Sequence, residues 1–157
     1  MEVTDLEAVT LLRERLLKKY PEWTDLRFAS SGDVPILRLS LPHREDHELS
    51  VEVGRTEATV AYSDGLPPGP AEQLFIWNDD QLEEGLDAVC EHIAGLVRGE
   101  VLLVREQLSR FTQFVRRHDC DSLLWFVATE DFERWSRRRR RRVQRVWSWD
   151  GTQRLAI

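Results

Sequence analysis

Residues 48–62 read ELSVEVGRTEATVAY. Apolar and polar side chains alternate from Glu48 to Val53 and again from Ala58 to Tyr62, and the four residues between these runs include a glycine. Alternation with a period of two is typical of a strand that buries one face and exposes the other. Two such runs joined by a short connection predict neighbouring antiparallel strands whose exposed side is acidic.

The strand pattern continues toward the N-terminus. In residues 35–41, PILRLSL, the leucines at 37, 39 and 41 fall on one face, and a shorter strand signal occupies residues 26–34. Together these runs predict an antiparallel meander. Residues 63–72, SDGLPPGPAE, hold three prolines and two glycines, which predicts a surface loop.

Two amphipathic helices flank the predicted strands. The first begins with a capping box, Thr4 to Glu7, and ends before Pro21. The second has competing N-caps at residues 78–80 and a glycine stop at Gly99. The expected apolar stripes are Leu6, Val9, Leu12, Leu16 and Tyr20 in the first helix, and Leu82, Leu86, Val89, Cys90, Ile93, Leu96 and Val97 in the second.

The last third of the chain predicts strands at residues 101–104, 123–128 and 143–149, with a short helix from residue 129. Residues 107–117 fit both a helix and a strand, and a polar turn is expected at residues 117–121. We therefore expect one α+β domain spanning residues 1–157. It has a single antiparallel sheet of five to seven strands, with the two main helices packed on one face.

The composition favours a folded bacterial protein of the cytoplasm. The 157 residues are 41% hydrophobic, which excludes a disordered acidic chain, and no apolar run reaches the roughly 18 residues of a membrane span. The N-terminus lacks the features of a secretory signal. Cys90 and Cys120 lie far apart, which predicts free thiols, and twenty arginines against two lysines suggest a GC-rich bacterial coding bias.

The sequence contains no recognisable catalytic or metal-binding motif. Nucleophile-elbow and phosphate-loop patterns are absent. Cys90 lies on an apolar stripe, which predicts a core residue. The polar residues at 43 and 45–48, with His43 and His47 among them, are interpreted as a solvated turn because no metal-binding helix pattern surrounds them. We expect a protein that is not an enzyme and uses neither cofactor nor metal.

Charge is unevenly distributed along the chain. Residues 1–100 carry 21 acidic and 9 basic side chains, whereas residues 101–157 carry 7 acidic and 13 basic ones. The two parts either neutralise each other or present separate faces to partners. The candidate partner-binding residues are the acidic Asp79, Asp80, Glu83, Glu84 and Asp87, and Arg138, Arg139, Arg140 and Arg141 of the arginine run with Trp147 and Trp149.

The order of elements resembles a group of small bacterial proteins, some of them immunity proteins of polymorphic toxin systems. The resemblance lies in residues 45–105 and in the closing WSWDGT of residues 147–152. Members often carry histidines after the meander, where this chain has LPPGP at residues 66–70. The resemblance implies a stoichiometric binder, not a catalyst.

Three functions remain open at this point. The first is a non-enzymatic protein-binding module, immunity-like, that uses charge-segregated surfaces. The second is nucleic-acid association through residues 137–142, where arginine and tryptophan supply charge and stacking. The third is a secretion-chaperone-like dimeric adaptor. Monomer and homodimer are both left open.

Overall fold

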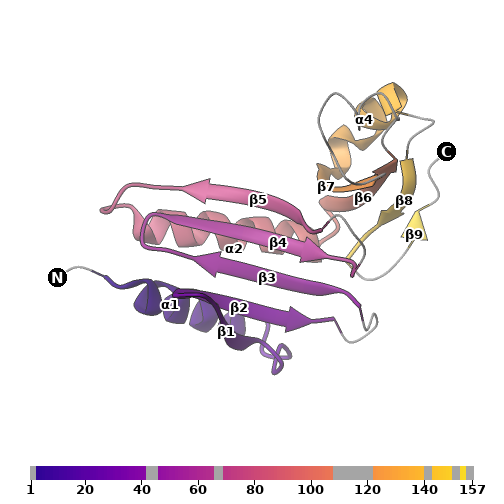
Figure 1. The fold of residues 1–157 in the computed structure, drawn as a ribbon. Coiled ribbons are helices and arrows are strands. Elements are labelled where there is room, and N and C mark those ends of the chain that lie inside the picture. The colour runs from indigo at the N-terminus through magenta and orange to yellow at the C-terminus, as the bar shows by residue number, and fades with distance from the viewer. Residues whose placement is uncertain are drawn as a thin grey trace. The chain divides into compact units, whose positions relative to one another are not determined.

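The computed structural model describes residues 3–41, 46–65, 69–107, 122–139, 143–149 and 153–154. The chain divides into two compact units (Figure 1). Unit 1 comprises residues 1–63 and 72–93, and unit 2 comprises residues 64–71 and 94–157. The α+β class and the antiparallel meander are confirmed.

The first helix, α1, spans Asp5–Lys19 and begins with the expected capping box. The Thr4 hydroxyl accepts from the Glu7 backbone N–H, while the Glu7 carboxylate accepts from the Thr4 N–H at 2.7 Å. Its buried stripe is Ala8, Val9, Leu12 and Leu16. Leu6, which was expected in this stripe, is 65% exposed because it lies roughly a quarter-turn around the helix from it.

Unit 1 holds a five-stranded sheet whose strands follow chain order. The strands are β1 (Arg27–Ser31), β2 (Val34–Ser40), β3 (Glu48–Val53), β4 (Glu57–Ser63) and β5 (Ala71–Ile76). The register aligns Val51 with Leu37 on one side and with Val60 on the other. Since all three are buried, the alternation in the sequence placed the core face correctly.

β5 is a strand that the sequence did not predict. The loop expected over residues 63–72 ends earlier, and the strand begins at Ala71, directly after Pro70. Most of its side chains are exposed, so it lacks the clear apolar alternation that revealed β3 and β4. Strands with two accessible faces leave a weak signal in the sequence.

The second helix, α2, spans Leu82–Val97. It begins after Gln81 and not within residues 78–80, since the Gly85 N–H donates to the Gln81 carbonyl at 2.9 Å and Gln81 therefore precedes the first turn. The Gln81 side chain accepts a hydrogen bond from the Asn78 N–H at 3.3 Å. The helix ends as expected. Gly99 has a φ of 74°, and the N–H groups of Gly99 and Glu100 donate to the carbonyls of Leu96 and Gly95.

Unit 2 contains a separate sheet, where the sequence predicted a continuation of the first. Its order is β7-β6-β8-β9, so β6 is an inner strand. The elements are β6 (Val101–Gln107), β7 (Ser122–Ala128), the 3-10 turn η1 (Thr129–Asp131), α4 (Phe132–Arg139), β8 (Val143–Trp147) and β9 (Gln153–Arg154). Of the ambiguous segment, residues 107–117, Gln107 ends β6, and the rest lies outside the described residues together with the turn expected at residues 117–121.

Unit 2 has its own small core. Leu102, Val104, Val127 and Val146 are buried together, and Phe132, Trp135 and Val143 pack against them. Across the described parts of both units, no helix combines the length and apolar character needed to span a bilayer.

Candidate protein-binding surface

The uneven charge of the chain coincides with the two units. Unit 1 carries 19 acidic and 8 basic side chains, a net −11, and unit 2 carries 9 acidic and 14 basic ones, a net +5. These values add to the −6 of the whole chain. The charge asymmetry therefore follows the division into two units, whose net charges are opposite in sign.

The turn between β5 and α2 is held in place by Trp77. Its backbone N–H donates to the Thr56 carbonyl at 2.9 Å, and its indole Nε1–H donates to the Arg55 carbonyl at 2.8 Å. Trp77 is 8% exposed. These two hydrogen bonds fix the start of the turn that carries the acidic residues Asp79 and Asp80.

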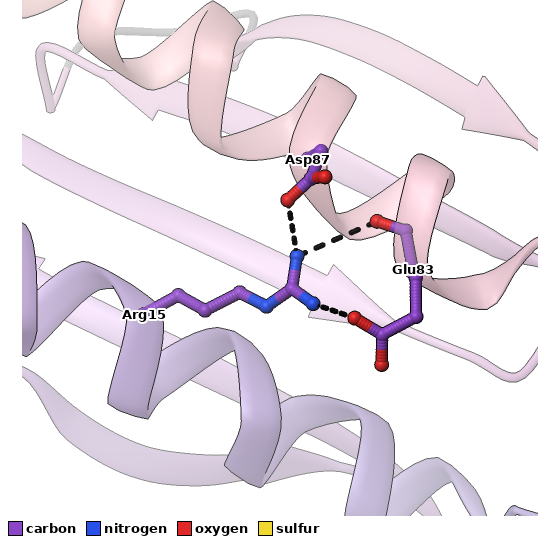
Figure 2. A network of polar contacts seen from close by, with 3 residues as sticks. All are labelled: Arg15, Glu83 and Asp87. Carbon is purple, nitrogen blue, oxygen red and sulfur yellow. Dashed lines mark hydrogen bonds and ion pairs between the residues drawn. The ribbon is translucent and has the colours of Figure 1, made fainter.

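Arg15 of α1 bridges two acidic residues of α2. Its guanidinium donates to the carboxylates of Glu83 and Asp87, and more distantly to the Glu83 carbonyl at 3.4 Å (Figure 2). The Arg15 side chain is 27% exposed, whereas those of Glu83 and Asp87 are 68% and 76% exposed. The arginine therefore fixes the positions of both carboxylates while they remain accessible to solvent.

Two of the five acidic candidates form no ion pair within the described part of the chain. Asp79 pairs with Arg55, at 3.0 Å between Oδ1 and Nε. Asp80 and Glu84 are exposed, and neither forms an ion pair with any residue the structure describes. The structure brings all five acidic candidates to one end of α2, where they form what we call the acidic surface: Asp79, Asp80, Glu83, Glu84 and Asp87.

The basic candidates lie in unit 2. The arginine run begins inside α4, where the Arg137 guanidinium pairs with Glu133 and Arg138 is exposed. Arg139 ends the helix and its side chain is not described; Arg140 and Arg141 lie outside the described residues. The sequence predicted that Trp147 offers a surface for stacking beside the arginine run, but Trp147 is only 6% exposed, so its ring is buried.

Trp149, the last of the basic-region candidates, is half-buried. Trp125 of β7 is 39% exposed and is thus more accessible than Trp147, but it was not among the candidates predicted from the sequence. Of the aromatic residues proposed beside the arginine run, one is therefore buried and the other is partly covered. Stacking on nucleic-acid bases needs open ring faces.

Among the described residues, Cys90, His92 and His47 could act as nucleophile or base, and each is partly buried. Burial raises the pKa of the Cys90 thiol, which disfavours the reactive thiolate. Burial likewise lowers the pKa of His92, whose ring makes an edge contact with Phe75 at 5.5 Å between centroids. His47 Nδ1 lies 2.8 Å from the Tyr62 hydroxyl. Within the described ranges, no three His, Cys, Asp or Glu residues cluster in a metal-binding arrangement.

Two features of the structure were missed by sequence reasoning. One is the exposed apolar pair of β5, Leu74 and Ile76. The other is a buried ion pair in unit 2, where Arg105 Nε donates to Asp64 at 3.0 Å. The lone arginine at the end of the apolar run of residues 101–104 was a signal for the second, because a charge in a buried strand needs a partner.

Comparison with family models, with curated proteins and with solved structures found no match. The immunity-like assignment therefore stays a prediction.

Proposed function

We propose that this protein is a non-enzymatic binding module that recognises a basic protein partner through the acidic surface of α2. The observation that carries the proposal is the set of five exposed carboxylates in one turn and helix end, of which Asp80 and Glu84 have no ion pair among the described residues. An immunity-like protein that blocks a basic toxin is one form of such a module.

The arrangement supports recognition in two ways. Arg15 and Arg55 hold three of the carboxylates in place, which lowers the entropy lost when a partner binds. The net −11 of unit 1 also attracts a basic partner from a distance, and this steering accelerates association at low salt.

The test compares two double variants that change the net charge equally. Asp80→Lys with Glu84→Lys reverses the uncompensated carboxylates without disturbing Arg15. Glu22→Lys with Asp25→Lys, between α1 and β1, is the matched control, because both residues are exposed and form no ion pair with a described residue.

Tagged protein is used to capture partners from the native lysate after nuclease treatment, and the association rate of each captured protein is then measured. We expect the α2 variant to associate about tenfold more slowly than the control at low salt. Equal rates for the two variants would refute the acidic surface. Capture that depends on nucleic acid would instead favour the arginine run.

A further inference from the structure

β5 forms one edge of the five-stranded sheet. Its neighbour is β4, and no other described strand pairs with it. Leu74 is 52% exposed and Ile76 is 73% exposed. Exposed edge strands are usually protected by several charges, a proline or a bulge, yet β5 carries one charged residue, Glu72, and no proline.

The backbone of alternate β5 residues points toward the open side. The Trp77 N–H donates to the Thr56 carbonyl, on the side of β4. Because the backbone N–H and C=O groups of successive residues point to opposite sides of a strand, those of Leu74 and Ile76 point away from β4. The Gln73 side-chain amide donates to the Leu74 carbonyl at 3.2 Å. The Leu74 carbonyl, which points away from β4, thus accepts a hydrogen bond from the Gln73 side chain and not from a strand.

The side chains of β5 divide between the two faces of the sheet. Phe75 contacts His92 of α2, so it faces the helices. Because successive side chains of a strand alternate, Leu74 and Ile76 face the opposite side. A strand added beside β5 would extend this face and cover the two apolar side chains.

The charge of unit 1 selects the occupant. A second copy of the chain pairing edge to edge would bring two bodies of net −11 together, which is repulsive. An extended segment bearing lysine or arginine is attracted instead. The chain leaving β5 leads directly into Asp79 and Asp80, so basic residues at the end of such a segment would meet carboxylates.

We propose that β5 binds an extended, basic segment of a partner protein by strand addition. Backbone groups of Glu72, Leu74 and Ile76 would pair with the segment, its apolar side chains would lie beside Leu74 and Ile76, and its basic residues would lie beside Asp80. This inference rests on the proposed function and specifies the partner chemistry of the same acidic body.

The test uses two synthetic peptides, RRTVTVTRR and EETVTVTEE, and two variants. Leu74→Pro removes the N–H that points to solvent, a change that edge strands tolerate. Leu74→Val keeps the N–H and is the matched control. Affinity is measured by fluorescence anisotropy, and amide hydrogen exchange reports on Glu72, Leu74 and Ile76. Circular dichroism checks that both variants remain folded.

We expect the arginine peptide to bind and to slow exchange at these three amides about tenfold or more. Leu74→Pro should weaken this binding about tenfold, while Leu74→Val leaves it nearly unchanged. The glutamate peptide should not bind.

Four outcomes would overturn strand addition by a basic segment. If Leu74→Pro binds as well as Leu74→Val while Asp80→Lys with Glu84→Lys abolishes binding, the acidic surface acts alone and the proposed function survives. Failure of the arginine peptide to bind, or equal binding of both peptides, refutes the basic occupant. Protection of β5 that grows with protein concentration, without peptide, would identify a second copy as the occupant.

Discussion

Gly85 of α2 lies directly against the indole of Trp77. A methyl group at position 85 would overlap the indole carbons Cδ2, Cε3 and Cε2. The indole cannot easily retreat, because it is buried and its Nε1–H donates to the Arg55 carbonyl at 2.8 Å. The missing side chain therefore lets α2 approach the residue that anchors the acidic turn.

Replacing this glycine by alanine should destabilise the protein. Alanine favours a helix over glycine by about 1 kcal/mol, but forcing a side chain into a packed site costs about 1–3 kcal/mol. We expect Gly85→Ala to lower the free energy of unfolding by about 1 kcal/mol or more, measured by urea denaturation. The control is Gly95→Ala in the same helix, where the added Cβ would lie 3.4 Å from Val101 Cγ2. A stabilised Gly85→Ala variant would contradict the packing argument.

The buried ion pair of unit 2 should be sensitive to the loss of one partner. The side chains of Arg105 and Asp64 are 4% and 1% exposed, and Arg105 also donates to the Ser122 hydroxyl at 2.8 Å. Removing one member of a buried pair leaves an uncompensated charge, at a cost of about 3–5 kcal/mol. We expect Asp64→Ala to lose stability of this order in chemical denaturation.

A double variant separates the charge effect from packing. Asp64→Leu with Arg105→Met removes both charges, so it should be less destabilised than Asp64→Ala. Arg98→Ala breaks an exposed pair with Glu100 and should change stability little. A double variant as unstable as the single one would mean that the hydrogen bonds, not the charge balance, stabilise unit 2.

Acid should weaken unit 1 through His92. Burial lowers the pKa of this histidine in the folded protein below its ordinary value of 6.5, so the unfolded chain binds a proton more readily. The contribution of neutral His92 is complete above pH 6.5 and is lost as the pH falls through the lowered value. We expect His92→Gln to lose less stability than the original chain between pH 7 and pH 5, measured by denaturation at each pH. Parallel pH profiles would exclude His92 as the cause.

The local patterns of the sequence predicted the elements of unit 1 well where one face is buried. The alternation of residues 48–53 and 58–62 predicted one buried face, and the register pairs Val51 with Val60, both buried. The capping box at Thr4 and the glycine end of α2 also formed as expected. Each of these signals involves residues close in the chain, so tertiary contacts are not needed to recognise them.

The candidate site was predicted only in part. The acidic residues of α2 were identified from the sequence, but Arg15, which pairs with Glu83 and Asp87, lies 68 residues before Glu83. Burial of Trp147, exposure of Leu74 and the pairing of Arg105 with Asp64 were likewise not predicted. Each of these three features depends on which distant segments of the chain pack against one another.

The sequence by itself determined the period of the strands that bury one face, the start of α1, the glycine end of α2, and the opposite charge of the two parts of the chain. These properties depend on residues that are close together in the chain. Only the tertiary structure decided that the described strands form two sheets, that β5 is an edge strand of the first, and that Arg15 fixes two of the carboxylates. Strand pairing and ion pairing join residues that are distant in the chain, and their energies depend on the burial that the complete fold creates.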